Sequence, residues 1–346
     1  MAGAVVALAD PASVWHNPAG LAQQPPSARF QLYQSAGMDP QNDELKPKAA
    51  IFGGFHTNVG VWTSGLYFFT PYTMRYGADA RGEDGRATGQ VEAIYHSLSF
   101  PLALSAGGGR LKMGATLDWN FVSVGGSRLN GTFNTDNPRN PGKALAIKVK
   151  EPGGLSFSTG VSYRLLDYQP AGIRVRLGAV YRSKATDDLS NQAGAGGQTE
   201  EELLAAERNR LTDKLLSGKP GSVAVGLSTV GTLADDRQWT LARQWDQTRW
   251  DVGGVYARLS AGAEYLYPLQ GRYDIELAWR LGVYSATVAE DDSGLNWPDM
   301  TGYTMGVGLK SQDSYQVDLS LQHQSTEGPG RNSSSGVVMG LELSHF

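Results

Sequence analysis

The chain has no cysteine among its 346 residues, which excludes disulfides, thiolate nucleophiles and cysteine-based zinc or iron–sulfur sites. Charged residues make up only 18%, against the ~25% usual in soluble domains. The net charge of −4, without a run of Lys or Arg, argues against nucleic acid as a partner. No apolar run approaches the ~20 residues of a membrane-spanning helix. The start shows no signal-peptide pattern, so we expect a mature or trimmed form.

Glycine and a strict alternation of apolar and polar residues are abundant instead. Glycine occupies 44 positions, nearly double the ~7% of average usage, and aromatic residues make up 10%. Apolar side chains alternate with polar or very small ones through residues 111–121 and again through 273–283. A period of two predicts β-strands that have one apolar face.

Fourteen segments show this alternation, and most are longer than the ~5–6 residues of a soluble strand and match the ~9–11 of a tilted spanning strand. Their connections alternate between long and short, which is typical of outer-membrane barrels. The alternative, a soluble β-sandwich or propeller, would carry more charge on its polar faces. We therefore predict an all-β fold: a fourteen-stranded antiparallel transmembrane β-barrel, which spans residues 28–346. The predicted strands are 28–36, 49–57, 61–69, 90–102, 110–124, 154–166, 173–185, 219–231, 237–247, 255–267, 272–284, 301–311, 315–326 and 335–346.

Residues 1–27 do not fit the strand pattern and are assigned to an N-terminal hatch. Eight strands are filled by their own side chains, whereas fourteen leave a lumen too wide for barrel side chains to fill. The N-terminal segment is the spare material on the periplasmic side, so we predict that it plugs the lumen. Asn17, Pro18, Ala19 and Gly20 should form a sharp Asx bend there and serve as hatch and gating residues.

One helix is predicted inside the longest loop, at about residues 199–216. Thr199 and Glu202 form a capping box. Leu204, Leu211 and Leu215 follow at helical spacing. This stripe either packs on neighbouring loops or offers an apolar surface where a hydrophobic ligand first binds.

Three motifs resemble the FadL/TodX family of outer-membrane transporters. Residues 4–21 contain the Asn17-Pro18-Ala19 signature of the family's hatch, preceded by Ala9-Asp10. Phe69-Thr70-Pro71-Tyr72 is similar to the turn after the family's third strand, and Tyr181-Arg182-Ser183-Lys184 to one of its strand ends. The last motif favours this family over the PorV-like proteins, which share the hatch motif.

The resemblance implies passive uptake of hydrophobic compounds, such as long-chain fatty acids or aromatic hydrocarbons, with lateral or hatch-gated release. It implies an outer-membrane location, a hydrophobic small-molecule partner, contact with membrane lipid and lipopolysaccharide, and a monomer without a cofactor. A PorV-like shuttle or scaffold for secreted proteins is the alternative. A plain porin for polar solutes would need an open lumen, which the hatch motif argues against.

A lateral exit requires a break in strand pairing, and glycine clusters are where such breaks form. The candidates are two adjacent glycines of the second predicted strand and two around the third. We expect a bulge or gap that faces residues 10–20. The four candidates are Gly53, Gly54, Gly60 and Gly65.

An amphiphile also needs a cation for its head group, and Arg binds a carboxylate through two parallel hydrogen bonds. Strict alternation places several cations on the inward face of the strands. They either form a carboxylate site or brace the barrel in ion pairs. Arg182 and Arg280 are expected near the outer ends of their strands, where they should lack a protein partner. The candidate binding cations are Arg176, Arg182, Arg280 and Lys310.

Catalysis has little support in the sequence, and we expect a protein that is not an enzyme. It contains no Gly-x-Ser-x-Gly motif, and its five histidines are scattered without metal-ligand spacing. His96 and Ser97 lie on opposite faces of one strand, so they cannot pair directly. No metal site is predicted.

Overall fold

The protein is described from a computed structural model. The structure describes residues 16–22, 24–38, 45–82, 85–123, 134–135, 153–185, 221–233, 236–250, 254–269, 275–290, 299–311, 315–327 and 333–345. The predicted helix at 199–216, with Leu204, Leu211 and Leu215, lies outside these residues, as do residues 1–15. None of the described segments forms a helix long and apolar enough to span a membrane.

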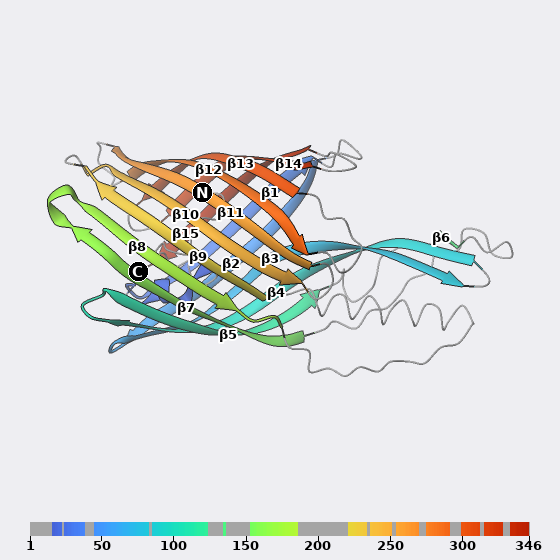
Figure 1. Cartoon of the computed structure of the whole chain (residues 1–346), viewed down its shortest axis with the longest axis horizontal. Coiled ribbons are helices and arrows are strands. Elements are labelled where there is room, and N and C mark those ends of the chain that lie inside the picture. Colours follow the sequence, from blue (N-terminus) through green and yellow to red (C-terminus); the bar gives the residue numbers. More distant parts are fainter. Residues whose placement is uncertain are drawn as a thin grey trace.

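All strands belong to one antiparallel sheet of fifteen strands. The sheet runs in the order β3-β2-β1-β15-β14-β13-β12-β11-β10-β9-β8-β7-β5-β4-β6, and an additional pairing joins β3 to β4. Figure 1 shows the strands as a curved wall inclined to its long axis. The pairing of β1 with β15 brings the first and the last strand side by side. The predicted all-β antiparallel class is confirmed, while the strand number of the complete barrel and the plugging role of the hatch stay predictions.

Each predicted segment coincides with one long strand, whereas the two-residue β6 beside β4 was not predicted. The strands are β1 (Ser27–Met38), β2 (Leu45–Val59), β3 (Trp62–Gly82), β4 (Gly85–Ala106), β5 (Leu111–Ser123), β6 (Asn134–Thr135), β7 (Gly153–Tyr168), β8 (Ile173–Arg182), β9 (Gly221–Thr232), β10 (Gln238–Trp250), β11 (Gly254–Leu269), β12 (Ile275–Glu290), β13 (Asp299–Ser311), β14 (Tyr315–Glu327) and β15 (Ser333–His345). Two short 3-10 turns are η1 (Pro18–Leu21) and η2 (Gln169–Ala171).

The hairpin of β3 and β4 is longer than the alternation predicts. The two strands have 21 and 22 residues, and their pairing continues to Gly82 and Gly85. This hairpin and β6 project beyond the other strands in Figure 1. Sequence alternation detects only the part of a strand that has one apolar face, so the projecting part escaped it.

Alternation assigns the side chains to an outer and an inner face. Large apolar side chains are exposed on one face, for example Leu117 at 51%, Trp119 at 53% and Leu281 at 60%. Their sequence neighbours on the other face are small or polar, and η1 packs against that face of β4, β5 and β7. This outward apolar surface is what a strand needs to face lipid.

Candidate lumen site

The described N-terminal residues form a capped turn against the inner wall. The side-chain oxygen of Asn17 accepts a hydrogen bond from the backbone N–H of Ala19 at 3.1 Å, and Pro18 begins η1. The side-chain amide of Asn17 donates to the carbonyl of Val161 in β7 at 3.0 Å. Residues 17–22 are buried. The expected bend at Asn17-Pro18-Ala19-Gly20 is present, and its gating role stays a prediction.

A pair of glycines makes the recess that holds this turn. Gly114 of β5 and Gly160 of β7 are directly opposite each other in the ladder. A Cβ on Gly114 would overlap backbone atoms of Pro18 and Ala19, and one on Gly160 would overlap the side chain of Asn17. This recess was not predicted from the sequence. Its signal was glycine at an inward position in two neighbouring strands.

Two cations of the inner wall bind carbonyl groups of the N-terminal segment. The guanidinium of Arg182 in β8 donates to the carbonyl of His16 at 2.5 Å and to Oγ of Ser222 at 3.1 Å. The Nζ of Lys112 in β5 donates to the carbonyl of Ala22 at 2.8 Å. The expectation that Arg182 lacks a protein partner is therefore wrong, because it holds the segment that enters the lumen.

His16 lies in a strongly positive environment. Its burial, together with the guanidinium groups of Arg182 and Arg258, lowers the pKa of His16 to about 3. His16 is therefore neutral near pH 7. Protonation would place a third positive charge beside two guanidinium groups, so it opposes the docked position of this segment.

Strand β2 holds the following residues of the segment. His56 Nε2 lies 2.7 Å from the carbonyl of Pro25, and its Nδ1 lies 2.6 Å from the hydroxyl of Tyr67. A carbonyl only accepts, so a neutral His56 donates from Nε2 and accepts from Tyr67. The side-chain amide of Asn58 donates to the carbonyl of Gln24 at 2.9 Å. His56 therefore connects the segment to the wall through Nε2, and its Nδ1 contact with Tyr67 joins β2 to β3.

The inner wall near β2, β3 and β4 is apolar. Leu21 and Ala22 of the segment form a buried cluster with side chains of these strands. The ring centroids of Phe52 and Tyr67 are 5.4 Å apart, and those of Phe52 and Phe69 are 6.2 Å apart. The cluster consists of Leu21, Ala22, Phe52, Tyr67, Phe69 and Ala103.

The next part of the wall, on β4, β5 and β7, is polar and buried. Ser97 donates to Asn120 at 2.8 Å, and Asn120 donates to Ser156 at 2.8 Å. Asp118 accepts from the hydroxyl of Ser99 and, at 3.4 Å, from that of Ser156. All five side chains are less than 9% exposed. This network satisfies polar groups that would otherwise be costly to bury.

The pairing around β3 is regular on one side and irregular on the other. β2 pairs without a shift with β1 and with β3, so the break expected at Gly53 and Gly54 is wrong. Gly60 forms the β2–β3 turn with a φ of +65°. The β3–β4 ladder skips Gly65 and Leu66 and shifts register farther along β3, so an interruption does lie at Gly65, on the side of β4.

Two prolines account for this irregularity. The β3–β4 pairs Ser64–Leu102 and Tyr67–Ser99 flank Pro101, which has no amide hydrogen to donate. A register shift follows between Phe69 and Tyr72, where Pro71 lies. Proline inside the neighbouring strand was therefore a second sequence signal for this region, in addition to Gly65. The lateral-exit role of this region stays a prediction.

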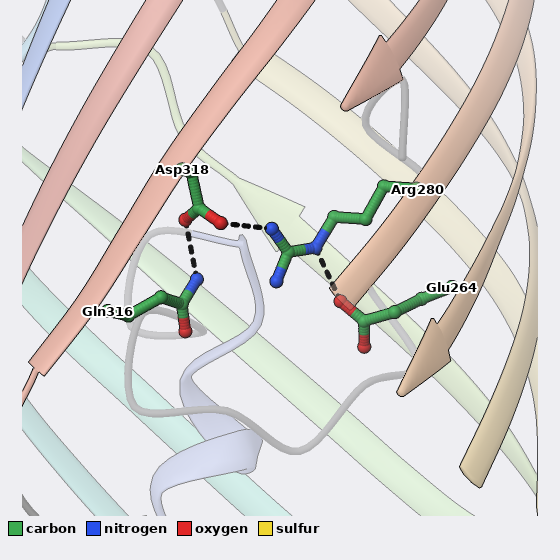
Figure 2. Close-up of polar contacts among 4 residues, drawn as sticks. All are labelled: Glu264, Arg280, Gln316 and Asp318. Atoms are coloured by element: carbon green, nitrogen blue, oxygen red, sulfur yellow. Dashed lines mark hydrogen bonds and ion pairs between the residues drawn. The ribbon is translucent and has the colours of Figure 1, made fainter. Parts of the chain in front are cut away.

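Arg280 occupies an ion-pair cluster rather than an unpartnered position. Its Nε lies 2.5 Å from a carboxylate oxygen of Glu264 in β11, and its Nη1 pairs with Asp318 in β14 (Figure 2). Gln316 donates to the second oxygen of Asp318 at 2.6 Å. Arg280 is the sixth residue of β12, so it also lies closer to the periplasmic start of that strand than expected. The expectation that it lacks a partner is wrong.

The structure does not gather the four candidate cations at one place. Arg182 ends β8 at the expected outer side, whereas Lys310 lies one residue before the end of β13 at the periplasmic side. Lys310 is opposite Glu276 in β12. Arg176 lies in the first half of β8 and is partly buried. No group of three or more metal-ligand side chains suited to a metal ion occurs among the described residues.

Solved structures that resemble this chain share its architecture over nearly their full length. A FadL homologue from Pseudomonas aeruginosa aligns with a TM-score of 0.59 at 14% identity, covering 100% of this chain and 96% of that one. The CymD monoaromatic hydrocarbon channel gives a TM-score of 0.57 at 15% identity, covering 96% and 92%.

The toluene transporter TodX of Pseudomonas putida gives a TM-score of 0.55 at 14% identity, covering 97% of this chain and 94% of that one. The chain has the fold of the FadL/TodX channels. No protein-family model and no curated protein matches the sequence. The resemblance expected from the hatch and strand motifs is thus confirmed at the level of the fold.

Proposed function

We propose that this protein is an outer-membrane channel for the passive uptake of hydrophobic compounds. The observation that carries the proposal is the apolar part of the lumen wall, where Phe52, Tyr67 and Phe69 pack beside an irregular stretch of the β3–β4 ladder. Similar solved structures include a monoaromatic hydrocarbon channel and a toluene transporter. Both are channels or transporters, which favours uptake over the scaffold alternative and over catalysis.

In this proposal the compound moves along the apolar wall and leaves sideways between β3 and β4. Weak pairing at Pro101 and Pro71 lowers the number of backbone hydrogen bonds that must separate for the exit to widen. The outer wall faces lipid and lipopolysaccharide, and the protein acts as a monomer. Residues 16–26 act as the gate, since they contact the same wall through Leu21 and Ala22.

Uptake of a labelled monoaromatic hydrocarbon into proteoliposomes tests the route. A disulfide between cysteines placed at Ser64 and Leu102, which are opposite each other across β3 and β4, should reduce uptake, and reductant should restore it. The matched control is a disulfide between Thr57 and Ser64, which are opposite across the regular β2–β3 ladder and should leave uptake unchanged. Equal uptake by both cross-linked proteins would contradict a lateral exit at β3–β4.

For compounds with a carboxylate, we propose that Arg182 is the head-group site. Its partner in the N-terminal segment is the neutral carbonyl of His16, and a carboxylate is a stronger acceptor for a guanidinium. A bound carboxylate that replaced this carbonyl would release the segment from β8. Ligand binding and hatch opening are then coupled through one side chain.

Arg182→Ala tests this site. We expect fatty-acid binding to weaken roughly ten- to a hundredfold, as for loss of a charged hydrogen bond, with little change for an uncharged hydrocarbon. The hydrocarbon serves as the internal control for folding and for the apolar route. Equal weakening for both ligands would show that Arg182 only braces the segment.

A further inference from the structure

One strip of the inner wall is polar along nearly the whole length of a strand. Five successive inward positions of β14, from residue 316 to residue 324, carry polar side chains, and each is partly exposed to water. The eight residue steps from Gln316 to Gln324 cover about 27 Å along the strand. At a strand tilt near 40°, this length spans roughly 20 Å of the membrane thickness. This is most of the ~25 Å apolar band of an outer-membrane barrel. The five are Gln316, Asp318, Ser320, Gln322 and Gln324.

Glycines in β13 extend this strip to β12. Gly308 and Gly302 lie opposite Asp318 and Gln324. A Cβ on Gly308 would overlap the carboxylate of Asp318 and crowd the guanidinium of Arg280. Without these Cβ atoms, side chains of β12 cross over β13 and reach β14. Arg280 does so to pair with Asp318, as Figure 2 shows.

A second crossing lies nearer the outer end of the same strands. The hydroxyl of Tyr284 donates to Oε1 of Gln324 at 3.0 Å, above Gly302. The guanidinium carbon of Arg258 in β11 lies 4.7 Å from the centre of the Tyr284 ring. The polar surface therefore continues from β11 to β14 at two heights. It differs in kind from the apolar wall of β2–β4.

Water reaches this strip but not the opposite polar wall. The side chains of Arg280, Glu264 and Asp318 are 19%, 19% and 24% exposed. On β4 and β7, two of the strands that η1 contacts, Ser99 at 1% and Ser156 at 3% are closed to solvent. The turn lies against the β4, β5 and β7 side of the lumen wall, whereas the Arg280 cluster and the inward residues of β14 between positions 316 and 324 stay accessible.

We propose that the β11–β14 wall forms a hydrated path for small monovalent ions, separate from the apolar route, with the Arg280 cluster as its selectivity site. The cluster joins one guanidinium to two carboxylates, so its net charge is −1 and it favours cations. A unit charge that acts through water over about 5–10 Å changes the local ratio of cations to anions by at least about twofold. The path goes beyond uptake of hydrophobic compounds and does not depend on it.

The test measures the potassium-to-chloride permeability ratio from reversal potentials in planar bilayers under a salt gradient. Arg280→Gln leaves two carboxylates, so the ratio should rise by about twofold or more. Asp318→Asn makes the cluster neutral, so the ratio should fall by a similar factor. Ser320→Ala, an inward change on the same strand without a change in charge, should leave the ratio unchanged.

A second pair of variants avoids disturbing the ion pairs. Gln322→Glu should raise the ratio and Gln322→Lys should lower it, because both add a charge to the strip outside the cluster. Electrophoretic mobility before and after heating identifies folded barrels. Opposite shifts within both pairs would support the path. Folded wild-type protein without ionic current, or equal ratios in all variants, would overturn it even if hydrocarbon uptake were normal.

Discussion

Gly114→Ala should loosen the N-terminal turn from the barrel wall. Gly114 lies on the inward face of β5 with the backbone of Pro18 and Ala19 against it. The added methyl would overlap the backbone carbonyl of Pro18 and the backbone nitrogen of Ala19, so no rotamer change relieves the overlap. The space beside Gly160, the opposite residue in β7, is already filled by the side chain of Asn17, so the turn cannot shift toward β7. The turn must therefore move away from the wall.

The size of the effect follows from the overlap. Overpacking a closely packed site costs about 1–3 kcal/mol, and backbone atoms on one side place this site in the upper half of that range. A loss of about 2–3 kcal/mol raises the ratio of undocked to docked turn by roughly 30- to 150-fold. If the turn closes the lumen, the fraction of time spent in a large open state should rise by the same factor.

Single-channel recording in planar bilayers measures that fraction. The matched control is Gly221→Ala in β9, where an added Cβ would meet neighbouring atoms at 3.5 Å or more, an ordinary contact distance. We expect the control to behave like the wild type. Equal open fractions and equal melting temperatures for Gly114→Ala and the control would show that the glycine recess does not hold the turn.

Three further predictions concern the same segment. Deleting residues 1–22 should produce a large permanent conductance in bilayers, and an unchanged closed barrel would place the plug elsewhere. Between pH 6.5 and about 3 the undocked segment binds a proton at His16, whereas the docked segment resists it. The free energy of docking is therefore at its full value above pH 6.5 and falls as the pH falls. Channel opening at pH 5 should increase roughly ten- to thirtyfold, and His16→Gln should remove this response. Tyr67→Phe should lower stability to urea by about 1–3 kcal/mol, because His56 Nδ1 loses its buried donor while the ring packing is retained.

The strands and their two faces were predictable from the sequence alone. A period of two can be read from adjacent residues, because successive side chains of a strand point to opposite faces. Residues 111–121 of β5 are an example. The Asx bend at Asn17 was predictable for the same reason, because its hydrogen bond spans only two residues. The length of β3 and β4 beyond residues 69 and 90 was not, since the alternation there does not mark a membrane face.

The partners of the inward charges were decided only by the tertiary structure. Arg280 reaches Asp318 across β13, 38 residues away in the chain, and this depends on glycine in the intervening strand. Arg182 reaches the carbonyl of His16, 166 residues away. Alternation states that such side chains point inward, but register, strand order and the path of the N-terminal segment determine what they meet. Pairing between distant strands carries no local periodic signal, so it could be established only from the folded molecule.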